Sequence, residues 1–223
     1  GMANAVRSTV HNARAKELAV AGHTEGVINC MAHNPPCVFN TRLSAVTRAS
    51  EDYFVGDAPK GKRQIHNSFG NTPWLGQTVW PDFDMFHSSD RHTGGMLAVV
   101  KALSGGPVYL SDAPADFVAE IIRPLCLSDG RLLRPLAPAT PLPESLFVSP
   151  FDGDDRAFRV IAPLAGGAAA VALYNLTDPQ IPVTGHLVAD DYACASAMLQ
   201  PWQGPWPIPP EGLIAWDWRA RSA

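Results

Sequence analysis

The sequence lacks the features that mark membrane, nucleic-acid and metal proteins. No apolar run in its 223 residues approaches the length of a membrane span. It has 17 basic against 21 acidic residues, and the net charge of −4 gives no support for binding to nucleic acid or to an anionic membrane. The seven histidines are scattered, with no HExxH motif and no paired Cys/His spacing. The sequence therefore predicts no metal site, and nothing in it predicts a cofactor.

Cysteine is also sparse. The four cysteines are Cys30, Cys37, Cys126 and Cys194. They form no CxxC pair and no regular framework, which is typical of reduced thiols, and Cys30–Cys37 is the one locally plausible bridge. Gly1-Met2 resembles the remnant of a cleaved tag, and no basic segment followed by an apolar one comes after it, as a secretion signal would require. We therefore expect a cytoplasmic protein.

The most informative stretch is Val79–Ser89, in which Asp82 and Asp84 stand two residues apart. In an extended strand these two side chains share one face. Their neighbours are Trp80, Phe83, Met85 and Phe86. Apolar surroundings are a poor setting for an idle charge, whereas a sugar site uses carboxylates to accept hydroxyl hydrogen bonds and rings to cover the C–H face. A buried strand whose aspartates cap a turn has the same pattern, and the residues fit both interpretations equally.

Two further stretches carry candidate site residues. Arg48 lies shortly before Glu51 and Asp52, which an aromatic pair follows. An arginine beside an acid is a common surface arrangement worth little energy, and the functional alternative places Arg48 and one carboxylate at the mouth of a barrel strand. His33 ends an earlier strand-like segment, where it would face a ligand, although a lone histidine more often has a structural role.

Strand-like and helix-like segments alternate as far as Leu127, and each strand ends in polar residues. The predicted strands are 26–32, 43–50, 79–86 and 107–112, and the predicted helices are 3–21, part of 60–77, 93–103 and 116–127. Within 60–77, Asn71-Thr72-Pro73 predicts an interruption that marks a helix start. The alternation indicates βα units around a parallel sheet or barrel, with chemistry at the carboxyl ends of the strands.

The character of the sequence changes after Arg131. Residues 134–143 are rich in proline and predict a linker. Short β-like runs follow at 145–149, 157–163, 168–176, 186–188 and 213–218. They indicate a small antiparallel sheet packed on the first unit. We therefore predict a partial (β/α) barrel over residues 1–133, and a linker with a C-terminal antiparallel β domain over 134–223.

Three segments together resemble one family. They are Arg-Ala-Ser-Glu-Asp-Tyr-Phe (48–54), Trp-Pro-Asp-Phe-Asp-Met-Phe-His-Ser (80–88) and Leu-Ser-Gly-Gly-Pro-Val-Tyr-Leu-Ser-Asp (103–112). Their order and spacing are similar to the raffinose synthase and seed imbibition protein branch of the α-galactosidases, glycoside hydrolase family 36. Cys30–Asn34 and Leu127–Arg134 resemble further segments of that branch, and the similarity runs from about residue 3 to about residue 150.

The resemblance implies an α/β fold: the C-terminal half of a (β/α)8 (TIM) barrel, followed by a small antiparallel β domain. It also implies a retaining double displacement by two carboxylates. The proton donor of the family maps onto Asp52, four residues after Arg48, with Glu51 as the fallback. The residues expected to bind the substrate are Arg48, Asp84, Met85, Asp82, Trp80 and His33. Among these, Asp84 and Met85 map onto the galactose subsite, and Asp82 is expected to support them.

The chain also departs from the family. The family's nucleophile lies on an earlier barrel strand in a Lys-x-Asp motif, and Lys16-Glu17 is no substitute for it. We therefore expect a glycoside hydrolase-like fragment or split subunit that acts on α-galactosides and is poorly active alone. The alternatives are a non-catalytic carbohydrate-binding protein and a galactosyltransferase of the raffinose-synthase type. A half barrel exposes two sheet edges, so we expect it to form a homo-oligomer or to bind a partner chain that supplies the other half.

Overall fold

The computed structural model describes residues 27–32, 34–39, 44–153, 155–177, 181–199 and 204–220. The helix predicted for 3–21 and the candidate site residue His33 lie outside these residues. None of the helices in the described ranges combines the length and the apolar character that crossing a bilayer requires.

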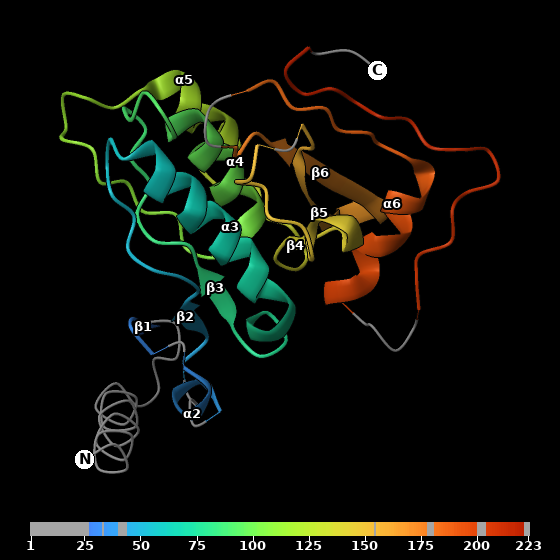
Figure 1. Ribbon diagram of the computed structural model, residues 1–223, viewed down its shortest axis with the longest axis horizontal. Coiled ribbons are helices and arrows are strands. Elements are labelled where there is room, and N and C mark those ends of the chain that lie inside the picture. Colours follow the sequence, from blue (N-terminus) through green and yellow to red (C-terminus); the bar gives the residue numbers. More distant parts are fainter. Residues whose placement is uncertain are drawn as a thin grey trace.

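The first sheet is parallel and contains three short strands in sequence order. They are β1 (Ile28–Asn29), β2 (Val46–Arg48) and β3 (Trp80–Asp82), and β2 lies between the other two (Figure 1). Each strand falls inside a predicted strand segment. An isolated parallel bridge joins Phe86, the last residue of the third predicted segment, to Leu110 in the fourth. The parallel pairing is compatible with consecutive βα units, and the half barrel stays a prediction.

Two helices follow the strands of this sheet. The 18-residue helix α3 (Ala58–Leu75) begins after Asp57, whose side chain accepts a hydrogen bond from the Lys60 amide at 3.0 Å. Helix α4 (Gly94–Ser104) ends at Gly105, which has a left-handed φ of 66°. It closely matches the predicted helix 93–103. A shorter helix, α2 (Pro35–Val38), lies between β1 and β2.

Two helices, α3 and α5, differ from their predictions near a proline. The interruption predicted at Asn71-Thr72-Pro73 was wrong, because α3 runs through Pro73. Pro73 lies in the last turn, where its missing N–H removes one helical hydrogen bond, and the buried side chains of Thr72 and Leu75 hold that turn. The helix predicted over 116–127 is only α5 (Ala119–Ile122), which continues through Pro124 as the 3-10 turn η2 (Arg123–Leu125).

The second sheet is antiparallel, in the order β4-β5-β6. Its strands are β4 (Thr140–Pro141), β5 (Phe158–Leu164) and β6 (Ala168–Tyr174). The 3-10 turn η4 (Ala165–Gly167) joins the last two strands. The remaining elements are η3 (Pro143–Ser145), α6 (Ala189–Ala193) and η5 (Cys194–Met198).

This region differs in part from its prediction. The strands predicted at 157–163 and 168–176 correspond to β5 and β6. Strand β4 lies within the segment predicted as a linker. The strands predicted at 145–149, 186–188 and 213–218 are absent from the described residues. These segments were predicted as strands because they contain apolar side chains. Those side chains do not enter the core: Phe147 is 92% exposed and Ile214 is 89% exposed.

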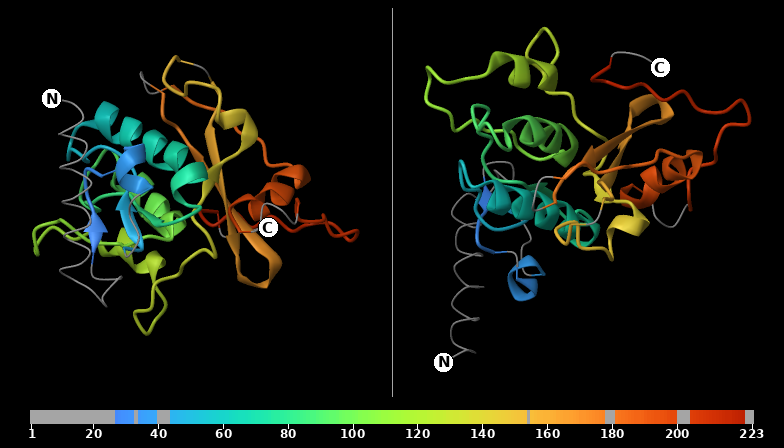
Figure 2. Two further views of the ribbon diagram at one scale, coloured as in Figure 1. Left: turned by 90° about the horizontal axis from the view of Figure 1, so that it is seen from below. Right: turned by 45° about the horizontal axis from the view of Figure 1, so that its top comes forward.

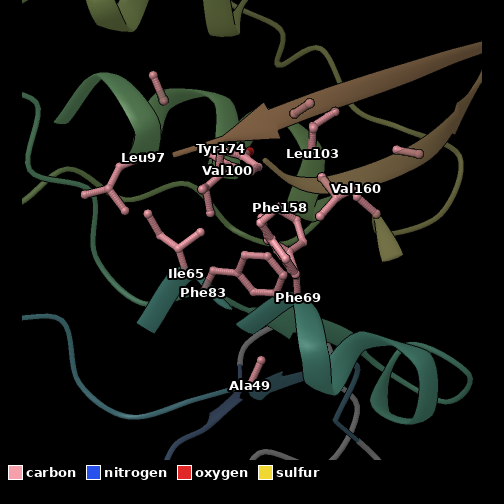
Figure 3. Packing of buried hydrophobic residues seen from close by; sticks show 14 of the residues in the cluster. Ala49, Ile65, Phe69, Phe83, Leu97, Val100, Leu103, Phe158, Val160 and Tyr174 are labelled. Carbon is pink, nitrogen blue, oxygen red and sulfur yellow. The ribbon is translucent and has the colours of Figure 1, made fainter. Parts of the chain in front are cut away.

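One hydrophobic core joins the two sheets. Helices α3 and α4 contact both sheets and lie between them (Figures 1 and 2). The Phe69 ring of α3 lies 5.1 Å from the Phe83 ring and 5.7 Å from the Tyr174 ring, between ring centroids. Phe158 of β5 completes this aromatic group (Figure 3). The core therefore crosses the predicted domain boundary at residues 133 and 134.

We predict that Phe69→Ala lowers the free energy of unfolding by about 3–5 kcal/mol, because it empties the centre of this core. The matched control is Phe147→Ala, at a ring that is 92% exposed, and it should change the stability by about 0.5 kcal/mol or less. Urea denaturation at one temperature measures both variants. Equal losses from the two variants would contradict the placement of Phe69.

Candidate functional site

One arginine gathers three carboxylates at the carboxyl end of the parallel sheet. Arg48 is the last residue of β2 and pairs in register with Asp82, the last residue of β3. Its Nε lies 2.9 Å from an Asp82 oxygen, its Nη2 lies 2.8 Å from Asp84 and its Nη1 lies 3.0 Å from Asp52. Because parallel strands end at the same edge of a sheet, the register alone brings Arg48 and Asp82 together.

The three carboxylates differ in burial. Asp82 and Asp84 are buried, whereas the Asp52 side chain is 62% exposed. Buried carboxylates need compensating donors, and the backbone amides supply two beyond the guanidinium. The Tyr53 amide donates to Asp84 at 2.6 Å, and the Asp84 amide donates to Asp82 at 3.0 Å. Burial opposes the charge of Arg48, but the hydrogen bond to Asp82 and the charges of Asp84 and Asp82 together raise the pKa of Arg48 above its ordinary value.

Tyr109 is a further donor to the buried pair. Its hydroxyl lies 3.0 and 3.1 Å from the two oxygens of Asp82 and 3.4 Å from Asp84. Burial, and then the negative charge of Asp82, raise the pKa of Tyr109, so the phenol keeps its proton at neutral pH. The sequence analysis assigned no role to Tyr109, although it lies in the motif at 103–112. Its place in the predicted strand 107–112, which follows the predicted strand of Asp82 and Asp84, is the signal that would have identified it.

Asp84 reaches Arg48 through a left-handed segment after β3, Phe83–Asp84, which we call the turn. The strand expected to run through Asp84 was wrong beyond Asp82, where β3 ends. Asp84 has a φ of +66°, in the left-handed region that non-glycine residues seldom adopt and that aspartate tolerates better than most. The chain adopts this conformation where the Asp84 carboxylate is bound by Arg48, which compensates for the unfavourable backbone geometry. The expected proximity of the two aspartates is present, but the geometry that produces it is a turn.

The loop that carries Asp52 is fixed by Asp90. Tyr53, the next residue after Asp52, donates its hydroxyl to the Asp90 carboxylate, and the Gly56 amide donates to the same oxygen at 2.9 Å. The Thr93 amide, at the start of α4, donates to the other oxygen of Asp90 at 3.2 Å. Asp90 thereby ties the loop between β2 and α3 to the first turn of α4.

Comparison with known proteins identifies the family. The model of the family described as raffinose synthase or seed imbibition protein Sip1 matches residues 4–175. The chain belongs to this family. The match confirms the family resemblance that the three motifs indicated. It extends to residue 175, beyond the predicted end of the similarity near residue 150.

Individual members of the raffinose synthase family match over part of their length. The chain is 35% identical over 144 residues to a probable galactinol–sucrose galactosyltransferase 6 of Arabidopsis thaliana, covering 63% of this chain and 19% of that protein. It is 40% identical over 131 residues to a probable galactinol–sucrose galactosyltransferase 4 of the same plant, covering 54% and 15%. It is 30% identical over 135 residues to stachyose synthase of Pisum sativum, covering 56% and 16%. The matched region is about a fifth or less of each of these curated relatives.

Other predicted site residues lie apart from Arg48. Glu51 accepts hydrogen bonds at 3.0 and 3.1 Å from Asn67 of α3. Trp80 begins β3, packs closely on Gly105, and lies under the Arg134 guanidinium, 5.3 Å from the ring centroid.

Met85 is half-buried and packs against the core. No group of three or more His, Cys, Asp or Glu side chains within the described ranges is arranged to hold a metal ion. The structure thus brings together Arg48, Asp52, Asp82 and Asp84, whereas Glu51 and Trp80 bind other partners.

We predict that Arg48→Met lowers the free energy of unfolding by about 3–5 kcal/mol, because two buried carboxylates lose their guanidinium partner. Arg131→Met is the control, since Arg131 pairs with Asp129 at 2.7 Å but its side chain is 76% exposed. That exposed pair should contribute about 1 kcal/mol or less. Urea denaturation at neutral pH compares the two variants, and a loss at Arg48 no larger than at Arg131 would contradict the cluster.

We predict a pH-dependent role in stability for Asp90. Burial opposes its charge, but hydrogen bonds from Gly56, Tyr53 and the start of α4 outweigh burial and lower the pKa of Asp90 below its ordinary value of 3.8. The stabilisation is therefore complete above the unfolded-state pKa and is lost as the pH falls toward the folded-state pKa. At pH 7, Asp90→Asn should cost about 2 kcal/mol.

The difference in unfolding free energy between wild type and Asp90→Asn, measured from pH 7 to pH 2.5, should shrink below about pH 4. A difference that stays constant over this range would mean that the carboxylate charge of Asp90 does not contribute.

Proposed function

We propose that this member of the raffinose synthase family takes part in galactosyl transfer from an α-galactoside, with Asp52 as the acid/base. The observation that carries the proposal is the unequal burial of the three carboxylates on Arg48. Asp52 is the exposed one, so it can exchange protons with substrate and solvent, while it stays 3.0 Å from a guanidinium that orients it. A general acid/base must combine this access with fixed geometry.

Asp82 and Asp84 suit sugar binding better than attack on the anomeric carbon. Both are buried, and both are bound by Arg48 and Tyr109. A carboxylate with most of its lone pairs engaged is a poor nucleophile, but it holds a fixed position from which a remaining lone pair can accept a hydrogen bond from a sugar hydroxyl. We assign Asp84 and the half-buried Met85 to the galactose subsite and Asp82 to its support. The second carboxylate of a retaining mechanism would then come from outside the described residues.

The proposed role of Asp52 has two steps. As the second carboxylate bonds to the anomeric carbon and the bond between that carbon and the leaving oxygen breaks, protonated Asp52 gives its proton to that oxygen. The resulting Asp52 carboxylate then takes a proton from the hydroxyl of the incoming acceptor, as the acceptor oxygen bonds to the anomeric carbon and displaces the second carboxylate. Arg48 stabilises the carboxylate between the steps. If the acceptor is a sugar the outcome is transfer, and if it is water the outcome is hydrolysis.

The names of the relatives favour transfer over hydrolysis, since those matched are galactinol–sucrose galactosyltransferases and a stachyose synthase.

A second candidate function is carbohydrate binding without catalysis. The observation that favours it is that Asp82 and Asp84 are buried and bound by Arg48 and Tyr109, so that neither is available as the nucleophile. A retaining mechanism needs two carboxylates at the reacting carbon.

Product analysis of the complete natural protein separates these functions. Galactinol is supplied as the donor and sucrose as the acceptor, and the sugars are resolved by chromatography. A trisaccharide product supports the proposal. If free galactose is the only product, the function is hydrolysis and not transfer. If methyl α-galactoside binds in calorimetry and no product forms, the function is carbohydrate binding.

We predict that Asp52→Asn lowers the turnover number about 10²- to 10⁴-fold for natural donors, whose leaving groups need a proton. The same variant should retain most of its rate of donor cleavage with an activated aryl α-galactoside, whose phenolate leaves unassisted. Glu51→Gln tests the other carboxylate that the sequence analysis named as a possible proton donor. If Glu51→Gln carries the loss and Asp52→Asn does not, the proton donor is Glu51.

A further inference from the structure

A buried lysine lies behind the turn that presents Asp84. Lys101 of α4 is 2% exposed, and its ammonium donates to two consecutive backbone carbonyls, that of Phe83 at 2.6 Å and that of Asp84. Gln64 of α3 is fully buried and also donates to the Phe83 carbonyl, at 3.0 Å. Two helices thus reach the same two-residue turn from within the core.

A buried lysine is energetically unfavourable at this position. Burying an ammonium costs several kcal/mol unless it is paired, and Lys101 makes no ion pair within the described part of the chain. Burial lowers the pKa of Lys101 to about 7, although the charges of Asp82 and Asp84 partly oppose that shift. An apolar residue at this position would avoid the cost of burying a charge, but it would leave the Phe83 and Asp84 carbonyls without this donor.

The contacts of Lys101 have a specific geometric consequence. The Asp84 backbone is left-handed, a conformation that persists only where surrounding contacts fix it. Lys101 binds the carbonyl of Asp84, while Arg48 and the Tyr53 amide bind its carboxylate. The residue is therefore held from the core through its backbone and from the sheet edge through its side chain.

We propose that Lys101 is a positioning residue for the galactose subsite: it fixes the Phe83–Asp84 turn through its two carbonyls and so sets where Asp84 presents its carboxylate to a sugar hydroxyl. This inference rests on the proposed function, because it assigns Asp84 to sugar binding. Lys101 acts through Asp84 and does not touch the sugar.

The chain offers a matched control. Lys62 of α3 is also buried, 3% exposed, and its ammonium donates to a backbone carbonyl, that of Thr177 at 2.8 Å. Thr177 follows β6 and belongs to neither the turn nor the carboxylate cluster. Lys62→Met therefore removes the same chemistry from the core without touching the turn at Asp84.

The test is the affinity for methyl α-galactoside, measured by calorimetry well below the unfolding temperature of every variant. Lys101→Met should raise Kd about 10-fold or more, and Lys62→Met should leave Kd within twofold of wild type. In an Asp84→Asn background, Lys101→Met should change Kd less than twofold further, because the group that it positions is already lost. A purely structural role would not produce this dependence on Asp84.

The outcomes separate the two proposals. If the wild type binds and Lys101→Met binds equally well, or if the loss persists undiminished in the Asp84→Asn background, the positioning role is overturned while the proposed function stands. If the wild type binds no galactoside, the proposed function fails and this inference fails with it. If Lys101→Met does not fold, Gln64→Met decides: a rise in Kd of about threefold supports a turn fixed from the core, and an unchanged Kd overturns it.

Discussion

The structure depends on one electrostatic constraint: Arg48 must neutralise two buried aspartates at the end of a parallel sheet. Asp82 and Asp84 are taken out of water, which is costly for a carboxylate without partners. A single guanidinium reaches both, and a third carboxylate as well, because its five N–H donors fan out in one plane. The register of β2 and β3, the left-handed turn at Asp84 and the fixed loop after Asp52 are the local structures that let one arginine do this.

The carboxylate cluster around Arg48 contacts the hydrophobic core on one side and solvent on the other. On the core side, α3 and α4 lie between the two sheets and pack into one continuous hydrophobic core, which supports the segment after β3. On the solvent side, the loop with Asp52 is tied to α4 through Asp90, while the Asp52 carboxylate itself stays exposed. Buried carboxylates in fixed positions beside one accessible carboxylate are compatible with the sugar binding and proton transfer that we propose.

Much of this arrangement could be predicted from sequence because it depends on short-range patterns. Polar residues at the ends of apolar segments indicated the shared sheet edge, and the resemblance to the family's acid/base motif singled out Asp52, four residues after Arg48. Tertiary context decided the rest. Pro73 is tolerated because it falls in the last turn of α3, and the runs around Phe147 and Ile214 form no strands because those side chains stay in solvent. The hydrogen bonds of Tyr109 join residues more than twenty positions apart, so local patterns do not predict them.

The central claim is that the carboxylates gathered by Arg48 form a galactoside site. The most direct measurement is a titration of isotope-labelled protein with methyl α-galactoside, followed by NMR through the Arg48 Nε–H and the backbone amides of Tyr53 and Asp84. Each of these groups donates to an aspartate of the cluster. The account predicts that all three signals shift together along one saturable binding curve. Saturable shifts confined to other regions, such as the exposed Trp216 and Trp218, with these three signals unchanged, would contradict it.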